Sequence, residues 1–170
     1  DFTNLDVNHS FSVLKIYKNT FADSVSIRNS TFMNISGSVL ALDKETDDRG
    51  IYNAENVVIE DCRVEDIGGS VLHLYRGGKD ESTFGPMLRM SNSTLKNVGG
   101  DKRNKSGASV SLHGVQEAYI SNSDFTDCKP FKLHLVVGEP ITKIKESQFE
   151  NTEKVVTHDG SYEGQDLNFE

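Results

Sequence analysis

The amino-acid sequence predicts an all-β fold, a parallel β-helix of five to six coils with loop excursions, and three observations support this prediction. A motif with the order apolar, any residue, Asn/Asp/Glu, Ser/Cys, any residue, apolar occurs five times along the chain. A second family of strands alternates with this motif in a fixed order. Equivalent positions return after about 23 to 38 residues. Short strands that repeat the same inward-pointing apolar residues, separated by spacers of variable length, are typical of a stacked solenoid.

The first repeated segment is expected to be a strand that ends in a bend. Its five copies cover residues 27–32, 59–64, 90–95, 120–125 and 144–149. Each copy continues to a second polar residue, and these residues are Asn34, Asp66, Asn97, Asp127 and Asn151. Because stacked strands lie about 4.8 Å apart, the five residues should form a column. Asn and Asp can satisfy turn amides or each other there, so we expect a structural ladder rather than a metal site.

The second repeated segment is a strand in which apolar residues alternate with polar ones. It reads SVLKIYK from Ser12, SVLALDK from Ser38, SVLHLYR from Ser70, ASVSLHG from Ala108 and, more loosely, FKLHLVV from Phe131. The alternation predicts the inward pairs Leu14/Ile16, Leu40/Leu42, Leu72/Leu74, Val110/Leu112 and Leu133/Leu135. Burial of large side chains in these columns should supply most of the stability, about 1.5 to 3 kcal/mol for each.

Two other folds explain the repeats less well. An antiparallel sandwich also uses many short strands, but it does not require the same motif to return in the same order. A leucine-rich-repeat horseshoe needs helix-like segments between its strands, and the sequence shows none. The length of 170 residues fits one domain over residues 1–170, and 14 glycines suit frequent turns. Cys62 and Cys128 fall in different columns, so we expect no disulfide between them.

Charge and hydropathy exclude some classes of partner. The net charge of −8 argues against nucleic acid, because phosphate binding needs clustered basic residues. No apolar run reaches the length that spans a membrane, so no membrane partner is expected. The start at Asp1 and the polar tail from His158 show no obvious caps for open strand edges, which predicts a piece of a longer chain.

The outward residues of the second strand family form the candidate carbohydrate-binding face. One predicted row is Lys15, Ala41, His73, Ser111 and His134, the next is Tyr17, Asp43, Tyr75, His113 and Val136, and Lys18, Lys44 and Arg76 close the first three strands. On an acidic protein, such a stripe would suit sugars that carry carboxylates, with Tyr for packing and Arg and Lys for the acids. Exposed strand positions favour Tyr and Lys in any case. The predicted contact residues are Lys15, Tyr17, Lys44, His73, Tyr75, Arg76, His113 and His134.

No metal, cofactor or catalytic motif is predicted with the same support. Calcium is a weaker hypothesis, with candidate ligands at Asp43, Asp47, Asp48 and Asp80. No short stretch has an EF-hand pattern, and acidic loops are usually just solvated. The sequence has no nucleophile elbow, HExxH, phosphate loop or dinucleotide fingerprint. Three histidines along a strand face are weak support for zinc.

Four segments carry a family resemblance. KNTFADSVSIRNSTF, DDRGIYNAENVVIEDC, LYRGGKDESTFGP and LHGVQEAYISNSDF, in this order, resemble the carboxy-terminal region of family 6 polysaccharide lyases, the alginate lyase and chondroitinase B-like group. The resemblance covers residues 18–155. It implies a right-handed, single-stranded parallel β-helix, an amino-terminal catalytic β-helix in the same parent chain, and β-elimination on a uronic-acid polysaccharide such as alginate. It also implies a bacterial, secreted or periplasmic protein in which calcium commonly neutralises the uronate.

The resemblance transfers no catalytic residue to this sequence. In the family, the Lys base and the Arg acid belong to the amino-terminal helix, in an Asn-Lys-Ser strand and a Leu-Arg-His-Gly strand. Here Asn104-Lys105-Ser106 is an isolated match in an expected loop. We therefore predict an accessory domain that supports the catalytic domain or contacts the polymer. The alternatives are a self-contained lyase that uses Arg76, Lys79 and Tyr75, and an independent carbohydrate-binding module.

Overall fold

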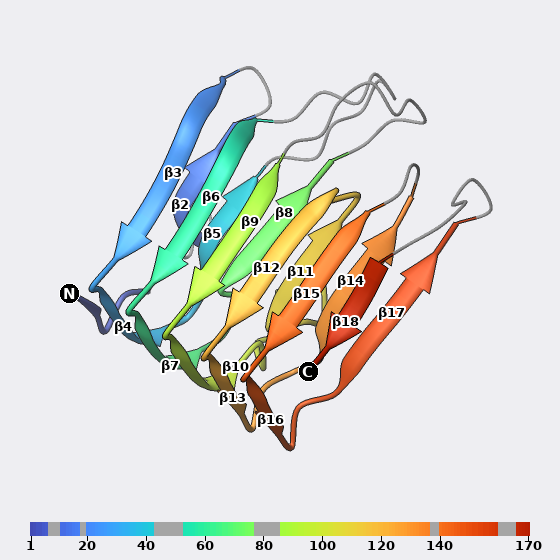
Figure 1. Cartoon of the computed structure of the whole chain (residues 1–170). Coiled ribbons are helices and arrows are strands. Elements are labelled where there is room, and N and C mark those ends of the chain that lie inside the picture. The colour runs from blue at the N-terminus through green and yellow to red at the C-terminus, as the bar shows by residue number, and fades with distance from the viewer. Residues whose placement is uncertain (7–10, 18–19, 43–52, 77–85, 137–139, 160–165) are drawn as a thin grey trace.

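The structure is a parallel β-helix of six coils. This computed structural model describes residues 1–6, 11–17, 20–42, 53–76, 86–136, 140–159 and 166–170. Its 18 strands form three six-stranded sheets, which we call A, B and C, and the chain visits them in that order. Each strand from β1 to β15 pairs in parallel with the strand three places later, so each successive set of three strands is one coil (Figure 1). The predicted fold is therefore confirmed.

Each sheet takes one strand from every coil. Sheet A contains β1 (Phe2–Thr3), β4 (Thr31–Ile35), β7 (Arg63–Ile67), β10 (Thr94–Val98), β13 (Asp124–Thr126) and β16 (Gln148–Glu150). Sheet B contains β2 (Ser12–Ile16), β5 (Ser38–Leu42), β8 (Leu72–Tyr75), β11 (Val110–His113), β14 (Phe131–Leu135) and β17 (Lys154–His158). Sheet C contains β3 (Ala22–Arg28), β6 (Ala54–Glu60), β9 (Met87–Ser91), β12 (Glu117–Ser121), β15 (Ile141–Lys145) and β18 (Asp166–Phe169).

The core runs along the axis of the stack as columns of apolar side chains. Alternation with period two places one face of each strand inside, where like residues of successive coils pack on each other. Phe125 is fully buried, and its ring stacks on Phe149 at a centroid distance of 4.5 Å and meets Phe131 edge-on at 6.2 Å. The aromatic core of coils 5 and 6 therefore joins sheets A and B.

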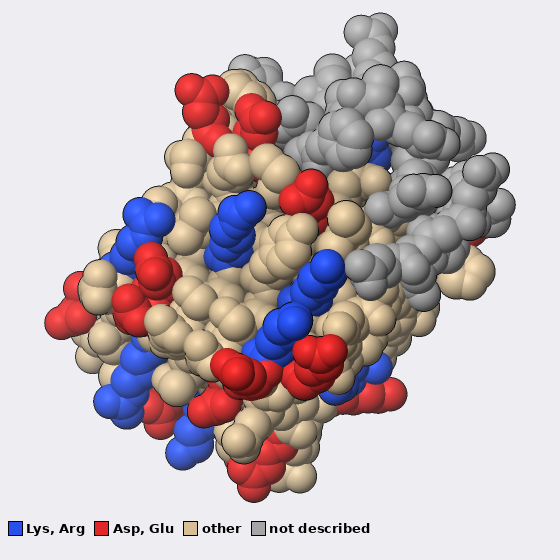
Figure 2. Space-filling view, viewed as in Figure 1, with Lys and Arg blue, Asp and Glu red and all other residues tan. Residues whose placement is uncertain are grey.

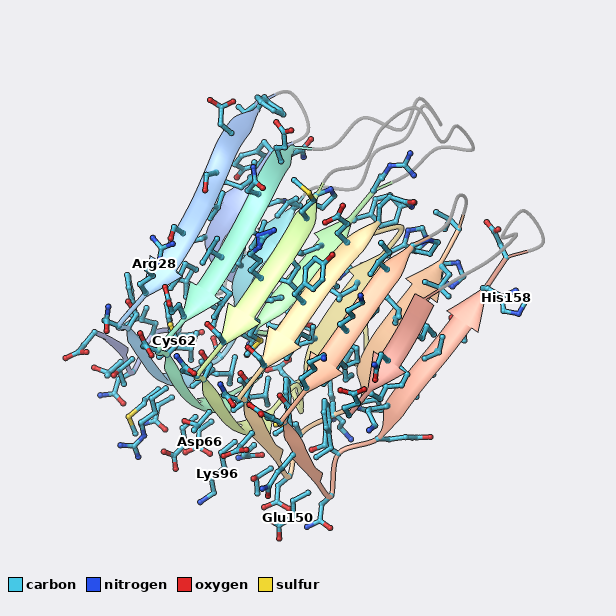
Figure 3. All side chains as sticks on the ribbon, in the orientation of Figure 1. Arg28, Cys62, Asp66, Lys96, Glu150 and His158 are labelled. Atoms are coloured by element: carbon cyan, nitrogen blue, oxygen red, sulfur yellow. The ribbon has the colours of Figure 1, made fainter. Side chains whose placement is uncertain are left out.

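The Asn/Asp column at the end of sheet A is the structural ladder that the sequence predicts. All five residues adopt positive φ, between 49° and 55°, which Asn and Asp tolerate better than other side chains. The amide of Asn97 donates to Asp66 at 2.6 Å, and the amide of Asn151 donates to Asp127 at 2.9 Å. Figure 3 shows Asp66 at this edge of sheet A. The column closes the bend by pairing one coil with the next.

A second column closes the bend from sheet C to sheet A. Asn29, Asp61, Asn92, Asn122 and Glu146 have positive φ at the ends of the sheet C strands. The next residue is Ser or Cys. The hydroxyls of Ser93, Ser123 and Ser147 each accept a backbone N–H from the preceding coil, as Ser93 does from Cys62 at 3.1 Å. Cys62 lies in this column (Figure 3), whereas Cys128 follows the bend at Asp127. Burial raises the pKa of both thiols, so the two free cysteines act as packing residues.

The predicted register of β14 is wrong by two residues. Phe131 pairs with Val110 and Leu133 pairs with Leu112, so His134 lies beside His113 and Lys132 beside Ser111. The prediction instead placed His134 beside Ser111 and Val136 beside His113. The physical reason is the short bend between β13 and β14, where Pro130 occupies the place of Ser109 and accepts its N–H at 3.0 Å. The strand therefore begins at an inward apolar position, without the preceding Ser-Val that marks the other copies.

The outer face of sheet C is polar and of mixed charge. Figure 2 shows basic and acidic side chains interspersed over this face. Arg28 pairs with Glu60 at 2.7 Å and Lys145 with Glu170 at 3.3 Å. Such a surface is typical of a solvated strand face rather than of a site for a highly charged polymer. Among the described residues, no helix has the length and apolar character needed to span a membrane.

Candidate carbohydrate-binding face

The outer face of sheet B carries two rows of side chains across the coils. The observed first row is Lys15, Ala41, His73, Ser111, Lys132 and Val155. The second row contains Tyr75, His113, His134 and Thr157, and Tyr17 follows the first strand of the sheet. The structure thus brings five of the predicted contact residues, Lys15, His73, Tyr75, His113 and His134, onto one face. It adds Lys132, which the predicted register had missed.

A groove of about 640 Å³ lies on the amino-terminal half of this face. Lys15, Ala41 and His73 form its floor, and Arg103, Asn104, Lys105 and Ser106 form a wall. The small side chain of Ala41, between Lys15 and His73, leaves the hollow. The groove therefore depends on one small residue between two longer side chains of the outward row.

The wall is the loop of residues 101–107, which extends along the sheet rather than away from it. The guanidinium of Arg103 lies 4.7 Å from the ring of Phe11 in coil 1. At the other end, Lys132 of coil 5 donates to the carbonyl of Ser106 at 2.8 Å. Between these two points, the Ser70 hydroxyl donates to the side-chain oxygen of Asn104 at 3.3 Å. These contacts to coils 1, 3 and 5 hold the loop in one place beside the groove.

The groove is lined by basic side chains. Lys15, Arg103 and Lys105 contribute cations, and no Asp or Glu is among the described residues that line it. Arg103 also pairs with Asp101 outside the groove, at 3.0 Å, which lowers the pKa of that carboxyl. The net charge of the protein is −8, so its long-range field repels anions. The basic side chains of the groove can therefore attract an anion only at short range.

His73 is the titratable residue of the floor with a shifted pKa. Its Nδ1 atom is buried and has no hydrogen-bond partner among the residues that the structure describes. Burial lowers the pKa of the imidazole, because the charged form loses its hydration. His73 is therefore neutral at pH 7, and it can offer a sugar hydroxyl a neutral donor or acceptor rather than a charge.

The second row is a stack of rings. The ring of Tyr75 lies 4.3 Å from that of His113, and His113 lies 4.6 Å from His134, with small interplanar angles of 13° and 23°. His113 Nδ1 donates to the carbonyl of Arg76 at 3.2 Å. Because neighbouring rings cover each other's faces, mainly ring edges remain for a ligand. The row therefore stabilises the face and contributes less sugar stacking than the sequence predicts.

Arg76 does not belong to the exposed stripe. The prediction placed it at the surface as a binding residue and as an alternative acid, but its exposed fraction is 0%. The next coil also packs closely on the backbone of Arg76, because a Cβ at Gly114, where φ is +68°, would collide with the carbonyl oxygen of Arg76. With no exposed surface, Arg76 is not presented to a polymer on the outer face.

Several predicted residues lie outside the described part of the chain. They are Lys18, Asp43, Lys44, Asp47, Asp48, Lys79 and Asp80. They include the four candidate calcium ligands and the alternative base of the self-contained lyase. Within the described ranges, no group of three or more His, Cys, Asp or Glu residues could hold a metal ion. The calcium hypothesis rests on residues outside the described ranges and stays a prediction.

The chain is similar to several solved structures, among them a lyase and its point mutant. The chain superposes on a PL6 family alginate lyase, AlyGC, with a TM-score of 0.80 and 41% identity over 87% of its own length. It superposes on a point mutant of that enzyme with a TM-score of 0.78 and 42% identity over 86% of its length. Each match covers 21% of the lyase, so the chain spans about a fifth of that protein.

Comparisons with family models and with curated proteins found no match. The structural match is nevertheless specific, because both the fold and about two-fifths of the aligned residues are shared. The same family is indicated by the four segments quoted from the sequence. We therefore identify the chain as a parallel β-helix of the family 6 polysaccharide lyase type.

Proposed function

We propose that the chain is an accessory, non-catalytic β-helix of a polysaccharide lyase, and that its groove contacts a uronic-acid polysaccharide such as alginate. The observation that carries the proposal is the basic groove on sheet B, where Lys15, Arg103 and Lys105 line a hollow without a described carboxylate. Uronic-acid polymers carry one carboxylate on each sugar, and cationic side chains with adjacent hydrogen-bonding groups suit them. The similarity to an alginate lyase supports this class of ligand.

The accessory role rests on the burial of Arg76 and on the share of the lyase that the chain covers. β-Elimination needs a base near the C5 proton and a cation that neutralises the carboxylate. Arg76 is fully buried, so it cannot supply that cation on the outer face. The chain spans 21% of the related enzyme, which leaves room for a catalytic β-helix elsewhere in a parent chain. The proposal includes an amino-terminal catalytic β-helix as partner and a secreted or periplasmic location.

A calorimetric titration with alginate oligosaccharides tests the binding part of the proposal. We expect saturable binding that weakens as salt is added, since the groove acts through exposed charges. Lys105→Ala should weaken binding by up to about fivefold, because an exposed ion pair contributes at most ~1 kcal/mol. Lys96→Ala is the matched control, because Lys96 is an exposed lysine of sheet A beside Glu65. Equal effects of the two substitutions would contradict binding in the groove.

An independent carbohydrate-binding module is the second candidate function, and the same groove favours it. The two candidate functions differ in whether this chain stabilises a linked catalytic domain. An accessory domain should stabilise a linked catalytic β-helix, whereas a module should bind sugar without affecting that domain. Comparing the melting temperature of the catalytic domain with and without this chain distinguishes the two. An unchanged melting temperature together with sugar binding would favour the module.

A further inference from the structure

The residues of the groove wall alternate between exposed and partly buried. Arg103 and Lys105 are exposed and line the groove, whereas Asn104 and Ser106 are partly buried. The hydroxyl of Ser106 donates to the side-chain oxygen of Asn104 at 2.7 Å, so these two side chains contact each other across Lys105. The two cations of the wall are therefore the immediate chain neighbours of one hydrogen-bonded asparagine.

The side-chain amide of Asn104 is engaged inside the protein at both its nitrogen and its oxygen. Nδ2 donates to the carbonyl oxygens of Gly99 at 3.0 Å and of Ala108 at 2.9 Å. Oδ1 accepts from the hydroxyls of Ser106 at 2.7 Å and of Ser70 at 3.3 Å. A side-chain amide has two N–H donors and one acceptor oxygen. Both donors of Asn104 are occupied, so we expect this residue to hold the loop rather than to bind a ligand.

These hydrogen bonds join the middle of the loop to both of its ends and to coil 3. Gly99 precedes the loop and Ala108 follows it, and a Cβ at Gly99 would lie 3.0 Å from the carbonyl oxygen of Ala108. The chain therefore enters and leaves the loop at nearly the same place. Ser70, which is 1% exposed, connects Asn104 to coil 3. Residues 101–107 include no apolar side chain, so the loop depends on polar and cation–π contacts rather than on hydrophobic packing.

We propose that Asn104 is a positioning residue, which holds Arg103 and Lys105 beside the groove for an anionic polysaccharide. This role rests on the proposed binding of a uronic-acid polymer there. A loop that is mobile in the free protein must lose conformational entropy when it binds a ligand, and this loss weakens binding. A loop that is already fixed avoids most of the loss. Asn104 thus contributes to affinity through its two neighbours, without a contact of its own.

A double-variant cycle, measured by calorimetry with alginate oligosaccharides, tests whether Asn104 acts through Lys105. Lys105→Ala should weaken binding by up to about fivefold in the wild type. In an Asn104→Ala background the same substitution should change the affinity by less than about twofold, because the lysine is no longer held in place. Asn56→Ala is the matched control background, since Asn56 of sheet C donates to the carbonyl of Asp23 at 3.2 Å and does not line the groove. In that background Lys105→Ala should keep its full effect.

Tryptic digestion without ligand tests whether Asn104 holds the loop. Trypsin cleaves after Lys and Arg, and the loop contains Lys102, Arg103 and Lys105. Because proteases cut mobile loops faster than fixed ones, mass spectrometry should find faster cleavage at these sites in Asn104→Ala than in the wild type. Asn56→Ala should match the wild type. If circular dichroism shows that Asn104→Ala is unfolded, Asn104→Asp replaces it, because it keeps the shape and loses both N–H donors.

Two results would overturn the proposal. The first is a folded Asn104→Ala variant whose loop is cleaved at the rate of the wild type. The second is an undiminished effect of Lys105→Ala on affinity in the Asn104→Ala background. If the wild type does not bind alginate, the proposed function is wrong, and faster cleavage of Asn104→Ala would still support the positioning of the loop. The digestion therefore separates a failure of the positioning role from a failure of the proposed function.

Discussion

At the scale of single residues, burial decides the chemistry of His73. Its pKa in the folded protein lies below the ordinary value of 6.5, because desolvation disfavours the imidazolium. At a pH between the lowered pKa of the folded protein and the ordinary pKa of the unfolded chain, His73 is protonated in the unfolded chain but neutral in the folded protein. The free energy of unfolding therefore falls as the pH drops below about 6.5, and this part of the stability is fully present above it.

Replacing His73 with Gln should remove this part of the acid sensitivity. We expect the melting temperature of the wild type to fall more between pH 7.5 and pH 5 than that of His73→Gln. The control is His158→Gln, because His158 is exposed at the end of β17 (Figure 3). Thermal unfolding followed by circular dichroism at the two pH values measures the difference. A pH response of His73→Gln as large as that of the wild type would contradict the assignment.

The residue types of the sheet B face could be predicted from the sequence, but their exposure could not. The alternation of each strand identifies Lys15, His73 and Tyr75 as outward residues. It gives no information on the bend after β8, so Arg76 was wrongly expected at the surface. It also does not show that residues 101–107 lie along the sheet, so the role of Arg103 and Lys105 as a groove wall was missed. The basic composition of that loop was the available signal.

At the scale of elements, the bends depend on residues in the left-handed region. Asn97 has φ of +51° and donates to Asp66 at 2.6 Å. Asn97→Ala should lose the hydrogen bond and also strain the backbone, at a cost of about 1–2 kcal/mol for the strain. Asn97→Gly should lose only the hydrogen bond, about 1 kcal/mol. Urea unfolding should therefore rank the wild type above Gly and Gly above Ala. Equal stability of the two variants would show that the bend is not strained.

The aromatic core gives a second test at this scale. Phe125 has an exposed fraction of 0% and contacts Phe131 and Phe149. Phe125→Ala should lower the free energy of unfolding by about 3–5 kcal/mol, because the cavity is enclosed by neighbouring coils. Phe2→Ala is the comparison, since Phe2 stacks on Phe32 at 4.9 Å but is 38% exposed at the end. A loss at Phe2 as large as that at Phe125 would contradict the described core.

The strands of the first four coils could be predicted well because their columns repeat closely. The Ser-Val-Leu start fixes the register of β5, and the Asn/Asp positions mark the bends. The prediction failed at β14 because the bend before it contains only the four residues 127–130, whereas the bend before β11 includes the loop of residues 101–107. The number of residues in a bend depends on the path of the backbone, so the sequence does not show at which residue the next strand begins. An alternating apolar strand such as FKLHLVV fits two registers that differ by two residues.

At the scale of the whole molecule, the solenoid separates its stability from its surface function. Each coil contacts only its neighbours, so the inward columns carry the fold and the outward rows are free to vary. This separation explains how a groove can form on sheet B while the face of sheet C remains a mixed, solvated surface. It also explains why proteins that share this fold can differ in activity, because the activity depends on the outward residues of each chain.

The central claim is that this chain contacts a uronic-acid polysaccharide without cleaving it. The most direct measurement incubates the 170-residue chain with alginate and follows the ultraviolet absorbance of the unsaturated sugar that β-elimination creates. The account predicts no increase above the buffer control at protein concentrations where calorimetry detects saturable binding. Steady product formation by the wild type that is abolished in a folded Arg76→Ala variant would contradict the account.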